Sequence, residues 1–150
     1  MNITKLHEEA GDGNVVAQSV LGICYLDGIG VEVNHQEAFR LLSSAAGRGV
    51  PRATASLARM YAEGLGTSKN FPEALRLYEA AAKAGEFLAQ IELGRMYARG
   101  IGVPVDKKKA LQWYAAAAAQ EKSVSDCDEL KEAKAFIEGA GHSAKDQSRS

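Results

Sequence analysis

The chain repeats itself every 36 residues, and this period restricts it to a small set of folds. Residues 17–52, 53–88 and 89–124 align without a gap. The three units share an alanine, a leucine, a tyrosine, a pair of glycines and an alanine pair. In the first unit these are Ala17, Leu21, Tyr25, Gly28-x-Gly30 and Ala45-Ala46. Periods of about 20–50 residues are typical of solenoids, in which stacked units bury a core that no single unit can form.

Each unit contains two apolar stripes at helical spacing, separated by a glycine-rich turn. The first stripe predicts helix A of each unit and the second predicts helix B. We expect A helices over 15–26, 53–63 and 89–99, and B helices over 35–47, 71–83 and 107–119. Capping helices are expected over 3–10 and 126–138, the latter ended by Gly139 and Gly141. The prediction is one all-α solenoid domain over 1–142, followed by a disordered polar tail over 143–150.

Residues at the helix ends agree with these boundaries. Asn34, Asn70 and Asp106 recur at one phase before helix B, and their side chains can accept hydrogen bonds from free N–H groups of the first turn. Glu37 and Glu73 follow three residues later, which predicts a capping-box-like arrangement in the first two units.

Small residues recur where the two helices of a unit must approach closely. Gly22, Ala58 and Gly94 share one phase, so added bulk there should be poorly tolerated. Trp113 and Tyr114 fall at core phases of helix B, and we interpret both as packing residues.

The composition excludes several functional classes. The net charge is −1 and the sequence pI is about 6.3, so we expect no attraction to nucleic acid. No apolar run approaches the roughly 20 residues needed to cross a bilayer, so no membrane insertion is expected. The N-terminal segment lacks an apolar signal-peptide core, which predicts a cytoplasmic chain, or a periplasmic or secreted one if a leader was removed.

No residue pattern indicates catalysis. His7, His35 and His142 share no metal-ligand spacing with each other or with the two cysteines, so we expect no metal and no cofactor. No grouping suggests a nucleophile with its base, and the prediction is that the chain is not an enzyme. Gly28-x-Gly30 lacks the further residues of a phosphate-binding loop, and we interpret it as a turn.

The pattern A-x-x-x-L-G-x-x-Y-x-x-G-x-G-V, followed by an alanine and a Y-x-A-A-A-like segment, resembles the Sel-1-like repeat family, a relative of the 34-residue tetratricopeptide repeats. The resemblance covers about residues 8–124. It implies a right-handed superhelix of antiparallel helix pairs, and adaptor or scaffold roles in which the concave surface holds a protein partner. Some relatives staple each repeat with a disulfide. This chain lacks those cysteines, which favours a reducing compartment.

In tetratricopeptide-like stacks helix A lines the concave side. We therefore predict a protein-binding groove from the phases that flank the core stripe of each helix A. We call this set the groove face. Its members are Val16, Val20, Ile23, Asp27, Arg52, Ser56, Arg59, Glu63, Leu88, Glu92, Arg95 and Arg99.

The expected ligand is a peptide or helix of another protein, with an apolar anchor at the valines and isoleucine and polar contacts from the arginines. The leading hypothesis is an adaptor, or the neutralising partner of a toxin or effector. Three alternatives stay open. The charges could pair locally, Arg59 with Glu63 and Glu92 with Arg95, while the valine and isoleucine side chains lie covered beneath the N-terminal cap. The chain could assemble on itself as a structural homo-oligomer, which is possible but not favoured. The site could lie on the convex B-helix face around Arg40, Arg76 and Glu79.

Overall fold

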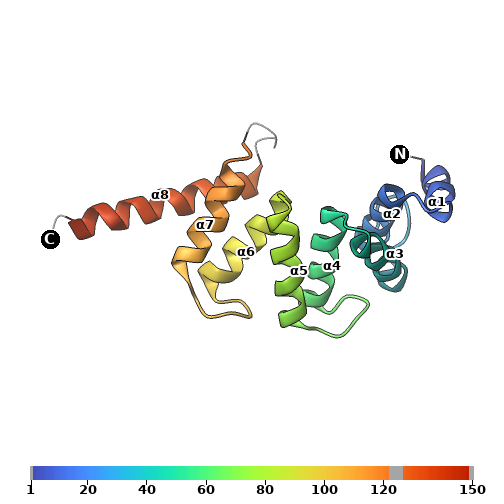
Figure 1. The fold of residues 1–150 in the computed structure, drawn as a ribbon, viewed down its shortest axis with the longest axis horizontal. Helices are drawn as coiled ribbons and strands as arrows, with labels where there is room; N and C mark the ends of the chain where they lie inside the picture. Colours follow the sequence, from blue (N-terminus) through green and yellow to red (C-terminus); the bar gives the residue numbers. More distant parts are fainter. Residues whose placement is uncertain (1, 122–126, 149–150) are drawn as a thin grey trace. The chain divides into compact units, whose positions relative to one another are not determined.

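The computed structural model describes residues 2–121 and 127–148, with side chains described as far as residue 141. Over these residues the only regular secondary structure is helical (Figure 1). The helices in the described part of the chain are α1 (Ile3–Gly11), α2 (Val15–Asp27), α3 (His35–Gly47), α4 (Pro51–Glu63), α5 (Phe71–Lys83), α6 (Phe87–Arg99), α7 (Lys107–Ala118) and α8 (Asp128–Ser148). The predicted all-α helical repeat fold is confirmed.

The predicted boundaries agree with the structure to within two residues through α7. α3 and α5 begin and end where predicted, and α1 and α2 each extend one residue further. α4 and α6 each begin two residues early. Pro51 stands in the first turn of α4, where its missing N–H has no intrahelical partner to lose.

The last helix differs from the prediction. α8 continues through Gly139 and Gly141 to Ser148, so the end predicted at residue 138 is wrong. A glycine lowers helix propensity by about 1 kcal/mol relative to alanine, but it ends a helix by adopting a left-handed conformation, and neither glycine has a positive φ. The predicted start at residue 126 lies outside the described residues. The segment predicted as a disordered tail is helical as far as Ser148.

The N-caps before helix B are confirmed. Asn34 Oδ1 accepts a hydrogen bond from the Glu37 N–H at 3.1 Å, and Asn70 and Asp106 make the same bond in the next two units. The glutamates of the expected capping box do not complete it. The N–H groups of Asn34 and Asn70 donate instead to the Tyr25 and Tyr61 carbonyls, at 2.9 and 2.8 Å. The two glutamates pair with arginines one turn along the helix, Glu37 with Arg40 and Glu73 with Arg76.

The paired glycines form the turn that follows helix A. Gly28 and Gly30 have φ of 71° and 72°, and the Ile29 N–H bonds the Cys24 carbonyl at 2.9 Å to close the helix end. A side chain at Gly66, the counterpart of Gly30, would place Cβ 2.6 Å from the His35 carbonyl oxygen. The turn therefore packs against the start of the preceding helix B.

The chain divides into two compact units, Met1–Glu86 (unit 1) and Phe87–Ser150 (unit 2). In unit 1 each helix from α1 to α5 packs on its neighbour in the chain, around a core that includes Leu42 and Met60. In unit 2 α7 packs between α6 and α8, with Tyr114, Leu93 and Leu130 buried. A single continuous right-handed superhelix remains a prediction.

The expected close approach of helices A and B is confirmed in the first and third repeats. A Cβ at Gly22 would lie 2.7 Å from Cγ of Leu42, and one at Gly94 would lie 2.8 Å from two ring carbons of Tyr114. Tyr114 is fully buried as predicted, whereas Trp113 is only partly buried.

Candidate functional site

The apolar end of the groove face exposes fewer side chains than predicted. Val16 on α2 is 63 % exposed, while Val20 and Ile23 are half-buried. Ile23 packs against the core cluster around Met60. The alternative in which all three apolar side chains are covered therefore fails for Val16, the member of this group that offers a partner most of its surface.

Arg59 on α4 joins two helices of unit 1 through ion pairs. Its Nη1 donates to Asp27 Oδ1 on α2 at 3.0 Å, and its Nε donates to Glu63 Oε2 one turn further along α4 at 3.3 Å. Arg52, at the start of α4, reaches Glu86 Oε1 at 3.4 Å. The cationic side of this face is thus already matched by carboxylates of the same unit.

Unit 2 holds a denser charge cluster. The Arg95 Nε lies 3.1 and 2.9 Å from the two carboxylate oxygens of Glu132 on α8, and Nη2 lies 2.6 Å from Oε2. Its Nη1 donates to Glu92 at 2.6 Å, and Arg99 lies 3.3 Å from Glu132. The Tyr114 hydroxyl of α7 donates to the same carboxylate at 3.0 Å. Glu132 therefore ties α8 to both α6 and α7.

This cluster shifts the protonation equilibria of its members. The hydrogen bonds from Arg95 keep the pKa of Glu132 below its ordinary value, and the Tyr114 hydroxyl acts in the same direction. The Arg95 pKa is raised, chiefly by its bond to Glu132, so the guanidinium stays protonated. Burial and the neighbouring carboxylate raise the pKa of Tyr114, so the phenol stays protonated and continues to donate.

The predicted groove face does not include Glu132, and the repeat explains the omission. α8 packs on α7 as α4 packs on α3, so it stands where a fourth helix A would follow. Glu132 lies 37 residues after Arg95 instead of 36, and the buried Leu130 is displaced from Leu93 by the same one-residue slip. An alignment that allows this slip places Glu132 at the phase of Ile23, Arg59 and Arg95.

The structure therefore brings the predicted arginines together with carboxylates instead of leaving them free. Within the described residues, each of Arg52, Arg59, Arg95 and Arg99 has an acidic partner in its own unit. Exposed pairs of this kind contribute only about 0–1 kcal/mol, so a ligand carboxylate can exchange into them. Arg95, with its side chain 28 % exposed, is the most enclosed of the four. Ser56 and Leu88, the remaining groove-face residues, are half-buried.

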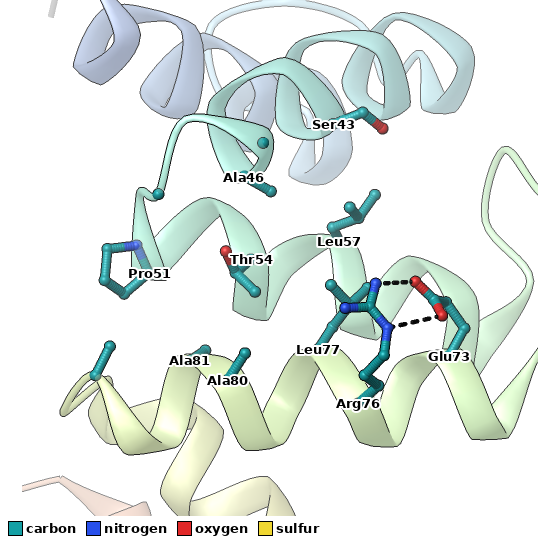
Figure 2. Close-up of a pocket in the computed structure, with 13 residues that line it drawn as sticks. Ser43, Ala46, Pro51, Thr54, Leu57, Glu73, Arg76, Leu77, Ala80 and Ala81 are labelled. Carbon is teal, nitrogen blue, oxygen red and sulfur yellow. Dashed lines mark hydrogen bonds and ion pairs between the residues drawn. The ribbon is translucent and has the colours of Figure 1, made fainter.

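A pocket in unit 1 shares no residue with the groove face. It has a volume of about 520 Å³ and runs between α3 and α5 across one side of α4 (Figure 2). Thr54 and Leu57 line it from α4, and Leu77 and Ala81 line it from α5. The ion pair between Arg76 and Glu73, with Nε 3.1 Å from Oε2, stands at one end.

Sequence reasoning missed this pocket, apart from naming Arg76 on the alternative B-helix face. The signal available in the sequence is that three phases of the second repeat carry shorter side chains than the same phases of the first repeat. Those phases are Thr54, Ala80 and Ala84 against Gln18, Ser44 and Arg48.

Comparison with known protein families identifies the repeat. The model of the Sel1 repeat matches residues 15–50, 51–86 and 88–122. The chain belongs to the Sel1 repeat family. The family repeats begin one or two residues before the units read from the sequence, in keeping with the early starts of α4 and α6.

Solved structures agree with the Sel1 assignment. The crystal structure of a Sel1 repeat protein from Oxalobacter formigenes is 42 % identical, with a TM-score of 0.71, over 91 % of this chain and 96 % of that one. The structure of c5321, a protective antigen present in uropathogenic Escherichia coli strains and displaying an SLR fold, is 34 % identical, with a TM-score of 0.71. That match covers 77 % of this chain and 25 % of the antigen. No curated protein matches the chain.

Sel1 repeat proteins generally mediate protein–protein interactions, and their helical repeat fold is generally non-enzymatic. Among the described residues, no helix combines the length and apolarity that crossing a membrane requires.

Proposed function

We propose that this chain is a non-enzymatic module that binds a peptide or helix of another protein on its groove face. The Arg95–Glu132 fork is the observation that supports this most directly. There an arginine of the face holds a carboxylate presented by a helix, α8, in bidentate geometry. A partner helix would repeat this contact at Arg59 or Arg52, whose side chains are more exposed than that of Arg95.

The two ends of the face in unit 1 have different roles in this proposal. Val16 supplies the apolar anchor and most of the affinity, because burial of an exposed side chain of this size contributes about 1.5–3 kcal/mol. The arginines supply orientation and salt sensitivity. The chain acts as an adaptor, or neutralises a toxin or effector by occupying one of its helices.

Selection of displayed peptides on the 150-residue chain tests this proposal. Peptides that bind the wild type should lose binding to Val16→Asp and to Arg59→Glu, and should keep it on Arg76→Glu, a matched charge reversal on the B-helix face. Val16 is preferred to Ile23 because Ile23 contributes to the core. Peptides that ignore the first two changes and lose binding to Arg76→Glu would move the site to the B-helix face.

Self-assembly is the second candidate, favoured by the exposure of Val16. Sedimentation velocity at several protein concentrations separates the two. A dimer that dissociates on Val16→Asp would replace partner binding with a homo-oligomeric scaffold, and a concentration-independent monomer would exclude the scaffold.

A further inference from the structure

We infer that the pocket between α3 and α5 binds a side-chain carboxamide, that of glutamine or asparagine, presented by a partner protein. The pocket shares no residue with the groove face, so the inference is independent of the proposed function. It rests on comparing the same phases in the three repeats, because two of the repeats contain a carboxamide there and the middle one does not.

The first repeat fills this position with its own side chains. The Gln18 amide nitrogen donates to the Ala10 carbonyl at the end of α1 at 3.2 Å, and its amide oxygen accepts from the Ser44 hydroxyl of α3 at 3.1 Å. Arg48 adds a bond to the Gly13 carbonyl at 2.9 Å. A carboxamide thus bridges two successive B-type helices over the start of helix A.

The third repeat also has a carboxamide at this phase. Gln90 on α6 occupies the position of Gln18 and is only 6 % exposed. Its amide oxygen accepts from the Gln120 side chain at 2.8 Å, and Gln120 stands at the phase of Arg48. Both repeats therefore place a hydrogen-bonded glutamine amide where helix A begins, half-buried at Gln18 and buried at Gln90.

The second repeat lacks the amide and its side-chain partners. Thr54 replaces the glutamine, and its hydroxyl donates to the Val50 carbonyl of its own helix at 3.1 Å. Alanines stand at the phases of Ser44 and Arg48. These shorter side chains leave the pocket of about 520 Å³ open between the helices.

The backbone acceptor used by the glutamine is retained. The Ala46 carbonyl accepts from the Gly49 N–H at 3.0 Å, as the Ala10 carbonyl does from the Gly13 N–H at 3.1 Å. The Ala10 oxygen accepts a second hydrogen bond, from the Gln18 amide. Among the described residues, no side chain donates a corresponding bond to the Ala46 oxygen, and Ala46 lines the pocket.

The charge of the pocket and the apolar side chains that line it favour a carboxamide. The two charged residues that line the pocket, Arg76 and Glu73, neutralise each other, so a neutral group is favoured. Leu57, Leu77 and Ala81 form an apolar wall for the methylene stem (Figure 2). A carboxylate cannot donate to the Ala46 carbonyl, and an aliphatic side chain would give that oxygen no second hydrogen bond beside the one from the Gly49 N–H.

The test is a titration of the 150-residue chain with acetyl-Ala-Ala-X-Ala-Ala-amide peptides in which X is glutamine, asparagine, leucine or glutamate. Amide chemical shifts of Gly47, Gly49 and Thr54 report occupancy. We expect saturable shifts in the millimolar range with glutamine or asparagine, and binding about fivefold weaker with leucine and glutamate, as for one lost hydrogen bond. Equal binding of the leucine peptide, tighter binding of the glutamate peptide, or no saturable shift would overturn the inference.

Two variants close the pocket in different ways. Thr54→Gln with Ala80→Ser copies the first repeat and should abolish the response to the glutamine peptide. If that variant does not fold, Ala80→Gln alone serves, because Ala80 is exposed on α5 and its longer amide can reach the pocket. Lys83→Gln, an exposed change on the same helix outside the pocket, should leave the response unchanged. An undiminished response in a folded pocket variant would refute the site.

Discussion

The close contact at Gly94 allows a quantitative test of the packing argument. In an ordinary helix, replacing glycine by alanine is favourable by about 1 kcal/mol. At Gly94 the added Cβ would lie 2.8 Å from two ring carbons of Tyr114, a distance that carbon atoms do not tolerate. The ring is 2 % exposed, and its hydroxyl is held by Glu132 at 3.0 Å, so it cannot move away freely. Overpacking of this kind costs about 1–3 kcal/mol.

We therefore expect Gly94→Ala to reduce the free energy of unfolding by up to about 2 kcal/mol, the overpacking cost less the helix gain. Gly139→Ala in α8 is the control, because no atom lies within 4 Å of its Cβ position, and it should leave stability unchanged or raise it. Urea unfolding provides the measurement, with the midpoint compared at unchanged slope.

A second arm isolates the role of the tyrosine. In a Glu132→Gln background the Tyr114 hydroxyl is held less firmly, so Gly94→Ala should cost less than in the wild type, and the double-mutant cycle should show coupling. Stability of Gly94→Ala equal to or above that of the wild type would refute the close-packing argument.

Two further predictions concern the ion-pair cluster and the helix caps. Glu132→Gln should lower stability at pH 7 by about 1.5–3 kcal/mol, and Glu138→Gln, an exposed change on α8, should not. Because the pKa of Glu132 is depressed, its contribution is present above its ordinary value near 4.5 and is lost as the pH falls through the lower folded value; unfolding at stepwise lower pH checks this. Asn70→Ala should cost about 1 kcal/mol in thermal or urea unfolding, since it removes the acceptor of the Glu73 N–H, whereas Asn70→Asp should retain most of the stability.

Much of the fold could be predicted from the sequence because its signals are local. The N-cap asparagines and the glycine pair after helix A determine backbone hydrogen bonds within a few residues of themselves. The 36-residue period and the apolar stripes therefore located the helices through α7 to within two residues. The end of the last helix was predicted wrongly. A glycine ends a helix when it adopts a left-handed conformation, and Gly139 and Gly141 do not adopt one.

The candidate sites depended on distances between helices, which no local pattern contains. The sequence located Arg59 and Arg95 on the predicted face, and it suggested pairing with Glu63 and Glu92 one turn away. The bonds to Asp27 and Glu132 come from other helices, and the second required a one-residue slip of register before α8.

The exposure of the groove-face side chains also depends on how the helices pack. Val16 and Ile23 are both apolar and flank the same stripe, yet one is on the surface and the other packs on the core, because burial depends on which neighbouring helix covers each side chain. The sequence contains the short side chains that open the pocket between α3 and α5. Only the packing of α3, α4 and α5 turns them into a space, since an alanine leaves a void only where the surrounding backbones are held apart by other contacts.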